Sequence, residues 1–195
     1  MERYTQIVQH KTSYYTFYLP IQLGMVLVSK CVAIYILKLI HTSLTFLCIY
    51  QAGIKNVESY RKARTILLAM GHFFQVQDDY LDCFGDPNVT GKIGTDIQDG
   101  KCSWVIVKAM QIANPSQRKI LKYNYGQHND EAVAKVKEVF NQLDMDGIYR
   151  NYEEEVYNDI IKQVDEISIA DTDGDQALNP DIFLSLLNKI YKRNA

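Results

Sequence analysis

The decisive stretch of this sequence reads Phe73-Phe74-Gln75-Val76-Gln77-Asp78-Asp79-Tyr80-Leu81-Asp82. On a helix, Asp78 and Asp82 lie one turn apart on the same face, and Gln75 lies on that face one turn earlier. Carboxylates at this spacing repel each other unless a cation lies between them. Mg²⁺ prefers oxygen ligands and completes its shell with water and substrate phosphates, so the pair is a candidate magnesium site. A solvated acidic helix end is the alternative, although the helix dipole disfavours carboxylates at a C-terminus.

Before and after this stretch, the spacing of apolar residues is that of helices. Apolar side chains recur at helical spacing from Val57 to Asp82, with charged side chains on the other face of the first half. No stretch alternates with period two for long, so we expect an all-α fold. Further helices are expected from Met1 toward Pro20 and over residues 101–113, 117–125, 130–143, 145–164 and 180–191.

Composition indicates a packed globular chain of one domain, or at most two small ones. Of its 195 residues, 47% are apolar and 23% are charged. The formal net charge of −2 provides no bulk positive charge, so we expect no nucleic-acid partner. The four cysteines form neither a CxxC pair nor a cluster with histidine, which favours free thiols in a cytoplasmic protein over zinc or disulfides.

One segment, residues 26–50, differs from the rest by being almost continuously apolar. Its length suits a single membrane span. Lys38 and His41 would lie near its middle, however, where a lysine costs roughly 2.5–3.5 kcal/mol on insertion scales. We therefore favour a buried core helix, or a segment foreign to the fold, over a membrane span.

Lysines and glycines follow the carboxylates in the loop Gly91-Lys92-Ile93-Gly94-Thr95-Asp96 and in Asp99-Gly100-Lys101. Glycines let the backbone approach an anion, and a lysine supplies a point charge for phosphate. The spacing is not that of a P-loop. Alone, such lysines are ordinary loop residues, but beside carboxylates that suit a metal they favour a diphosphate ligand. Lys11-Thr12, with Tyr15 one turn further along, is a further possible anion contact.

Three parts of the chain resemble the farnesyl diphosphate synthases of the polyprenyl synthase family. Tyr4 to Thr12, followed by Phe17-Tyr18-Leu19-Pro20, resembles one of their helices. The run from Gly71 to Trp104 is similar to their second aspartate-rich motif and the segment after it. Lys189 to Arg193 resembles their basic C-terminal tail.

The resemblance implies an all-α isoprenyl-synthase helical bundle with a defined activity. Members of the family condense isopentenyl diphosphate with an allylic diphosphate, dimethylallyl and then geranyl, to give farnesyl diphosphate. The allylic C–O bond ionises to a carbocation, and Mg²⁺ stabilises the leaving diphosphate. The resemblance also implies a homodimer if the protein is complete, and no membrane association.

Site residues follow from the resemblance by position. The Mg²⁺ ligands implied are Asp78 and Asp82, with Asp79 beside them, and Asp96 is implied as a partner that supports the motif. The resemblance implies that the backbone oxygen and hydroxyl of Thr12 face the carbocation. Residues implied to contact substrate are Lys11, Thr12, Tyr15, Gln75, Lys92, Lys101 and Arg193, of which Lys11, Thr12 and Lys101 are also implied in catalysis.

The chain also departs from the family pattern. The first aspartate-rich motif, which should face the second across the cavity, is not in the sequence. We therefore expect residues 1–195 to be the C-terminal portion of a single synthase domain, with 26–50 an insertion foreign to the family. Two other hypotheses stay open: a non-catalytic diphosphate- or partner-binding fragment that exposes apolar residues such as Ile66, Met70 and Phe74, and a single-pass membrane protein built on 26–50.

Overall fold

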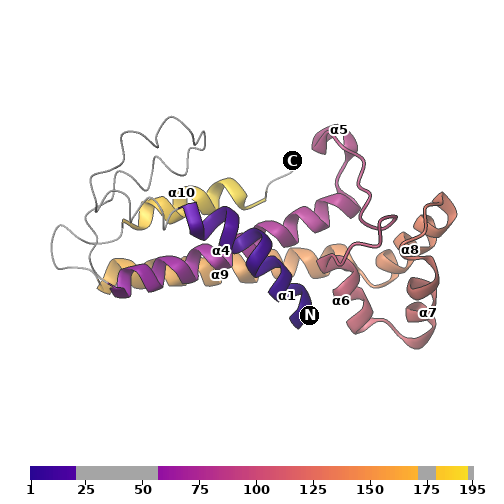
Figure 1. Cartoon of the computed structure of the whole chain (residues 1–195), viewed down its shortest axis with the longest axis horizontal. Coiled ribbons are helices and arrows are strands. Elements are labelled where there is room, and N and C mark those ends of the chain that lie inside the picture. Colours follow the sequence, from indigo (N-terminus) through magenta and orange to yellow (C-terminus); the bar gives the residue numbers. More distant parts are fainter. Residues whose placement is uncertain (21–56, 171–178, 193–195) are drawn as a thin grey trace. The chain divides into compact units, whose positions relative to one another are not determined.

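The computed structural model describes residues 1–20, 57–170 and 179–192. Within these ranges the regular structure is helical and no strand occurs, which confirms the all-α expectation (Figure 1). The helices are α1 (Glu2–Val8), η1 (Gln9–Tyr18), α4 (Val57–Phe84), α5 (Pro87–Thr90), α6 (Trp104–Ile112), α7 (Pro115–Asn124), α8 (Asp130–Gln142), α9 (Met145–Ala170) and α10 (Pro180–Ile190).

The described residues fall into two compact units. The first unit contains residues 1–7, 73–155 and 192. The second contains 8–20, 57–72, 156–170 and 179–191. The long helices α4 and α9 each contribute to both units, so each unit is described by itself below.

Aromatic rings form much of the core of the first unit. The rings of Tyr80 on α4 and Tyr149 on α9 stack with centroids 3.8 Å apart and planes within 5°. Phe84 extends the stack from Tyr80 at 5.1 Å, and the edge of Trp104 packs against Tyr149 at 6.1 Å. Stacked and edge-to-face pairs at these distances add to the hydrophobic gain from burial. This core fixes the part of α4 that carries the aspartates.

In the second unit, the N-terminal segment packs closely on α4. A β-carbon added at Gly71 would overlap the backbone of Ser13, so only glycine permits this approach. The guanidinium of Arg64 lies 5.3 Å from the ring centroid of Tyr18, a cation–π distance. Ile66 and Met70 are 2% and 0% exposed, so the expectation that they are exposed apolar residues is wrong.

The N-terminal helix changes type along its length. An α-helix was expected from Met1 toward Pro20, but α1 ends at Val8 and Gln9–Tyr18 is a π-helix. The Leu19 N–H donates to the Tyr14 carbonyl, five residues back, as the wider turn requires. Periodicity predicted a helix here but did not distinguish the two types of turn.

Helix starts follow short polar caps. Asp86 accepts from the Asn88 N–H at the start of α5, and Asn129 accepts from the Ala132 N–H at the start of α8. Asn114 and Gln117 form a capping box at the start of α7, where the sequence predicted a break before Pro115.

Candidate functional site

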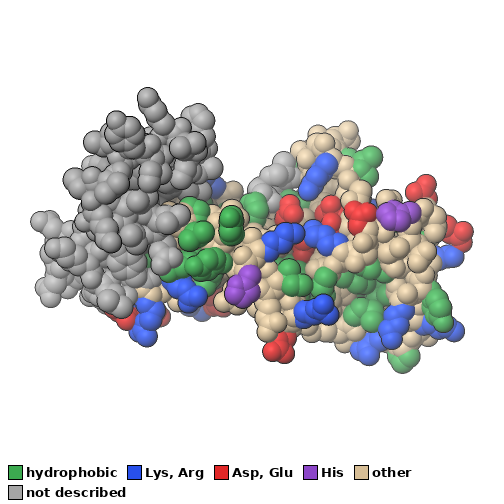
Figure 2. Space-filling view, viewed as in Figure 1, with side chains coloured by type: hydrophobic (Ala, Val, Ile, Leu, Met, Phe, Trp, Pro, Cys, Tyr) green, Lys and Arg blue, Asp and Glu red, His purple; other side chains and the backbone are tan. Residues whose placement is uncertain are grey.

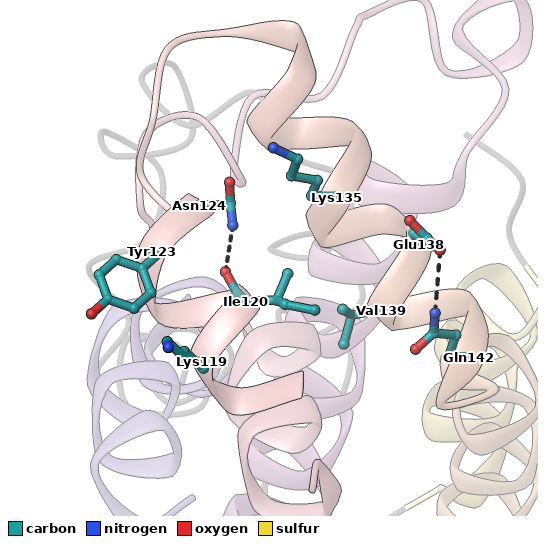
Figure 3. A pocket seen from close by; sticks show the side chains of 8 residues that line it. All are labelled: Lys119, Ile120, Tyr123, Asn124, Lys135, Glu138, Val139 and Gln142. Carbon is teal, nitrogen blue, oxygen red and sulfur yellow. Dashed lines mark hydrogen bonds between the residues drawn. The ribbon is translucent and has the colours of Figure 1, made fainter. Parts of the chain in front are cut away.

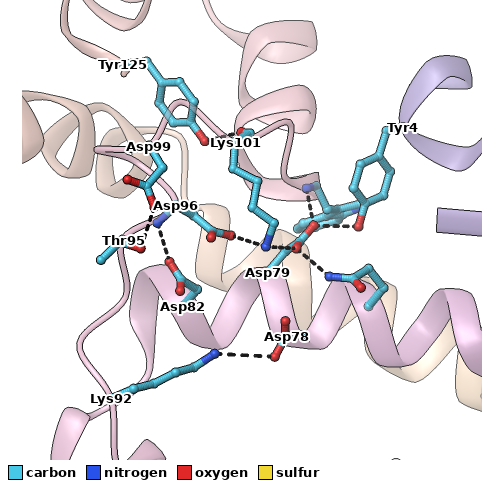
Figure 4. Close-up of polar contacts among 12 residues, drawn as sticks. Tyr4, Asp78, Asp79, Asp82, Lys92, Thr95, Asp96, Asp99, Lys101 and Tyr125 are labelled. Carbon is cyan, nitrogen blue, oxygen red and sulfur yellow. Dashed lines mark hydrogen bonds and ion pairs between the residues drawn. The ribbon is translucent and has the colours of Figure 1, made fainter. Parts of the chain in front are cut away.

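The C-terminal part of α4 carries the three aspartates within the first unit (Figure 4). Asp78 and Asp82 are half-buried and lie one turn apart on the same face, as the spacing predicted. Asp79 points elsewhere and is only 1% exposed. The three carboxylates therefore occupy two different environments.

Asp79 lies at the centre of a buried polar cluster. Its Oδ2 accepts from the Tyr4 hydroxyl at 2.7 Å and from the Trp104 backbone N–H at 2.8 Å. Its Oδ1 accepts from Gln75 Nε2 at 2.9 Å and lies 3.3 Å from Lys101 Nζ. Burial, and then the nearby Asp79 charge, raise the pKa of Tyr4, so its hydroxyl keeps the proton that it donates.

Lys101 bridges two carboxylates. Its Nζ lies 2.8 Å from Asp96 Oδ2 as well as 3.3 Å from Asp79 Oδ1. Burial alone would lower the pKa of Lys101, but the two carboxylates outweigh burial and raise this pKa, so the ammonium stays charged. Burial raises the pKa of Asp96, and Lys101 opposes that effect. The Tyr125 hydroxyl donates to the Lys101 carbonyl at 2.6 Å and fixes its backbone.

The segment between α5 and α6 lies against α4 at Asp82. The Asp96 N–H donates to Asp82 Oδ1 at 2.9 Å. A β-carbon at Gly94 would overlap the carbonyl oxygen of Asp82, so this close approach needs glycine. Further along, the Thr95 hydroxyl donates to Asp99 Oδ2 at 2.8 Å. These contacts bring Asp96 to the motif, where the resemblance implied a supporting partner.

Lys92 reaches the motif from the same segment. Its Nζ lies 3.8 Å from Asp78 Oδ1, and the two side chains are 56% and 38% exposed. A pair this exposed contributes little to stability, so Lys92 has the freedom to contact a ligand. Figure 2 shows acidic and basic side chains gathered next to one another over the end of α4 and the segment that follows α5.

The donor chemistry of the motif fits Mg²⁺. In the part of the chain that the structure describes, no group of three or more His, Cys, Asp and Glu side chains could by itself hold a metal ion. Mg²⁺ does not require such a cage, because it is usually held by one or two carboxylates together with water and substrate phosphates. Asp78 and Asp82 supply two carboxylates of this kind. Both Asp79 oxygens accept hydrogen bonds from other groups of the protein, which favours a role other than metal binding for that residue.

Some predicted residues lie outside this cluster. Lys11, Thr12 and Tyr15 belong to the second unit on η1, where Lys11 and Tyr15 are exposed and Thr12 is buried. Their roles stay predictions. Arg193 and the apolar segment 26–50 lie outside the described residues.

Two members of the Asp79 cluster, Tyr4 and Trp104, were not predicted from the sequence. Both occur in the stretches that carry the family resemblance, but neither has a local pattern that assigns a role to it. Their contacts to Asp79 span 75 and 25 residues of chain. Packing, which the spacing of residues does not report, creates them.

Two surface pockets of the first unit are lined by neither Asp78 nor Asp82. One, of about 410 Å³, lies between α7 and α8 and is lined by Lys119, Ile120, Tyr123, Asn124, Lys135, Glu138, Val139 and Gln142 (Figure 3). The other, of about 420 Å³, is lined by Tyr80, Leu81, Tyr149, Arg150, Glu153, Glu154 and Lys192. Neither lining includes a residue that the sequence predicted for the site.

Among the described helices, none is both long and apolar enough to cross a membrane. The membrane hypothesis rested on residues 26–50, which lie outside the described ranges, and so it is not tested.

Known proteins resemble the chain over nearly its whole length. The sequence model of the family described as polyprenyl synthetase matches residues 38–143. The chain is 45% identical to a farnesyl pyrophosphate synthase of Nezara viridula over 193 residues, which are 99% of this chain and 40% of that protein. It is 44% identical to the farnesyl pyrophosphate synthase of Bos taurus over 192 residues, which are 98% of this chain and 46% of that protein.

Solved structures agree with the sequence comparisons. T. brucei farnesyl diphosphate synthase, complexed with risedronate, matches with a TM-score of 0.77 and 29% identity over 100% of this chain and 46% of that chain. This match confirms the expected helical-bundle fold. The chain spans less than half the length of these relatives.

Proposed function

The chain belongs to the polyprenyl synthetase family, and from this we propose that it supplies part of the active site of a prenyltransferase. The reaction proposed joins isopentenyl diphosphate to dimethylallyl or geranyl diphosphate and gives farnesyl diphosphate. The farnesyl product is supported by the names of the relatives, with which the chain shares 44–45% of aligned residues.

One juxtaposition carries this proposal: two carboxylates that suit a metal lie beside two lysines that suit a diphosphate. Asp78 and Asp82 come from α4, and Lys92 and Lys101 come from the segment after α5. A diphosphate needs charge neutralisation from both a hard cation and hydrogen-bond donors, and this cluster offers both.

Each side chain has a separate role in the proposal. Asp78 and Asp82 would hold Mg²⁺, which when bound neutralises the diphosphate and makes it a better leaving group. Lys92 and Lys101 would donate N–H groups to the phosphate oxygens as charge-assisted hydrogen bonds. Because such donors are held in place before the substrate ionises, they stabilise developing negative charge without reorganisation. No side chain need form a covalent bond to the substrate.

The remaining assignments rest on the resemblance. Lys11, Thr12, Gln75 and Arg193 are proposed to contact the diphosphates or the allylic chain, and Tyr15 to line the cavity. The homodimer and the cytoplasmic location are proposed on the same basis. The partner-binding alternative is weakened at Ile66 and Met70, which are buried, whereas Phe74 is half-buried.

The proposal is tested by isothermal titration calorimetry of the full chain with inorganic pyrophosphate. We expect binding in the presence of Mg²⁺ and none when EDTA is in excess. The double variant Asp78→Asn and Asp82→Asn should weaken binding at least roughly 10-fold, as loss of metal-site groups typically does. Asp99→Asn is the matched control, because it removes an exposed carboxylate of the neighbouring segment. Equal magnesium-dependent affinity in the double variant and the wild type would contradict the proposal.

A separate assay asks whether the chain turns over substrate by itself. The full chain is incubated with geranyl diphosphate, isopentenyl diphosphate and Mg²⁺, and the extracted prenyl products are measured. Magnesium-dependent farnesyl product that the double variant does not form would extend the proposal to independent activity. Binding without product would limit it to a diphosphate site.

A further inference from the structure

Four segments of the first unit meet at the carboxylate of Asp79. Tyr4 comes from α1, Gln75 from α4, Lys101 from the segment after α5, and Trp104 from the start of α6. Figure 4 shows the side chains of Tyr4 and Lys101 pointing toward Asp79, while Asp78 points toward Lys92. The two adjacent aspartates therefore face different partners.

The lone pairs of the Asp79 carboxylate are already used. An ionised carboxylate offers about four acceptor positions on its two oxygens. Oδ2 has two donors, Tyr4 and Trp104, and Oδ1 has two more, Gln75 and Lys101. A metal ion at Asp79 would have to displace one of them from a position that is 1% exposed. Asp78 and Asp82, both half-buried, do not have this constraint.

Asp79 also stabilises the start of α6. The N-cap residue of that helix, Ser103, makes no side-chain capping hydrogen bond. The Asp79 carboxylate takes its place by accepting the N–H of Trp104, the first residue of the helix. A negative charge at a helix N-terminus is also favoured by the helix dipole. Asp79 on α4 is therefore joined directly to the start of α6.

Lys101 is held at the edge of this cluster with its side chain still accessible. The side chain is 37% exposed, whereas those of its partners Asp79 and Asp96 are 1% and 9% exposed. An ammonium has three N–H donors. Two of the N–H groups of Lys101 point at the carboxylates of Asp79 and Asp96, so the third N–H group is left for an anion outside the cluster.

We propose that Asp79 is a positioning residue and not a metal ligand: it fixes Lys101 and the start of α6 against the helix that carries Asp78 and Asp82. The inference rests on the proposed function, because Lys101 is the group that would contact the diphosphate. The two adjacent aspartates of the motif then have different roles. Asp78 faces the metal, and Asp79 holds Lys101, which donates to the diphosphate.

The test compares Asp79→Asn with Asp78→Asn in the full chain. Calorimetry gives the affinity for inorganic pyrophosphate at saturating Mg²⁺, and a Mg²⁺ titration at fixed pyrophosphate gives the magnesium midpoint. Trp104 is the only tryptophan of the chain, and its backbone N–H donates to Asp79, so its indole fluorescence reports on the packing at the start of α6 that this contact holds. Near-UV circular dichroism verifies that each variant is folded.

We expect the two variants to give opposite patterns. Asp79→Asn should shift the Trp104 emission. It should also weaken the binding of pyrophosphate about 10-fold, which is the effect of one misplaced charged donor. The magnesium midpoint should change less than about 2-fold. Asp78→Asn should raise the magnesium midpoint and leave the Trp104 emission as in the wild type. Asp99→Asn should change neither quantity. A magnesium midpoint raised as much by Asp79→Asn as by Asp78→Asn would overturn the proposal.

The outcomes separate this inference from the proposed function. If the wild type binds no pyrophosphate, the proposed function fails, and the Trp104 emission still tests the Asp79 contact. An unchanged emission in Asp79→Asn would overturn the inference in either case. If Asp79→Asn does not fold, Tyr4→Phe replaces it and removes one donor while keeping the charge. Tyr4→Phe should then shift the Trp104 emission and weaken the binding of pyrophosphate less than is expected for Asp79→Asn. If neither the emission nor the affinity changed, the inference would be overturned.

Discussion

The hydroxyl of Tyr4 donates to the carboxylate of Asp79 at 2.7 Å, in a buried hydrogen bond between residues 75 positions apart in the sequence. The bond ties α1 to α4 inside the first unit. Its acceptor is a charge that is removed from water, and a buried charge is tolerated only when donors surround it. The N-terminal helix thus contributes to the environment of the aspartate motif.

The first prediction concerns the stability contributed by this bond. Tyr4→Phe should lower the free energy of unfolding by about 1.5–3 kcal/mol, because the lost hydrogen bond has a charged acceptor. Urea denaturation followed by circular dichroism measures the change. Tyr123→Phe removes a hydroxyl from a side chain that is 71% exposed and should change the stability by less than about 0.5 kcal/mol. Equal stability of the two variants would contradict the prediction.

A second prediction compares two glycines of the segment after α5. Gly91 has a φ of 71° with open space around it, so Gly91→Ala should cost only the strain of the left-handed backbone, about 1–2 kcal/mol. At Gly94 the added methyl group would overlap the Asp82 carbonyl, so Gly94→Ala should cost about 3 kcal/mol or more. Thermal or urea unfolding of the two variants checks the order. If Gly91→Ala were the more destabilising change, the close approach at Asp82 would be refuted.

A third prediction concerns the buried carboxylate of Glu153 on α9. It accepts from the Tyr149 hydroxyl at 3.0 Å and from Gln77 Nε2 at 3.3 Å, and so joins α9 to α4. Glu153→Ala should lower the free energy of unfolding by about 1–3 kcal/mol, because two buried donors lose their acceptor. Glu154→Ala is the matched control, because Glu154 follows Glu153 in the sequence and its side chain is exposed. Urea unfolding that finds the two variants equally stable would contradict the packing described for Glu153.

A fourth prediction concerns the thiols. Burial raises the pKa of Cys83 to about 12, whereas Cys102 is exposed. Since only the thiolate reacts, iodoacetamide at pH 8 should alkylate Cys83 at least roughly 100-fold more slowly than Cys102. Peptide mapping by mass spectrometry measures each cysteine separately, and urea-unfolded protein is the control in which both react. Comparable rates in the folded chain would show that Cys83 is not buried.

The same pKa shift determines how stability depends on pH. The folded state keeps the Cys83 proton at pH values where the exposed thiol of the unfolded chain, with an ordinary pKa of about 8.5, has lost it. The free energy of unfolding should therefore fall as the pH rises from 9 to 12. Cys83→Ala should make that fall less steep, and an unchanged slope would contradict the assignment.

Local geometry was predictable from the sequence where it depends on near neighbours. The spacing of Asp78 and Asp82 placed both on one face of a helix, and the helix is present as Val57–Phe84. Asn114 before Pro115 predicted a helix boundary, and a capping box stands there. Such features are set within one or two turns of chain, and the spacing of residue types reports them directly.

The polar contacts between distant segments were not predictable in this way. Nothing near Tyr4 or Trp104 indicates that both donate to Asp79, and the pairing of Gln77 with Glu153 spans 76 residues. These partners meet only after the helices pack, so the local pattern around each residue is that of ordinary core. The π-helical turn of Gln9–Tyr18 was missed because an α-helix was expected there, with apolar residues three and four apart. The buried residues of this stretch recur four and five residues apart instead, namely Thr12, Ser13, Phe17 and Tyr18.

The widened turn of η1 has an evolutionary consequence. Each residue of an α-helix adds about 100° of rotation, so an extra residue would redirect every side chain that follows it. A π-helical stretch can absorb such an insertion locally. Tyr4 on α1 and Thr12 on η1 therefore need not keep a common α-helical phase.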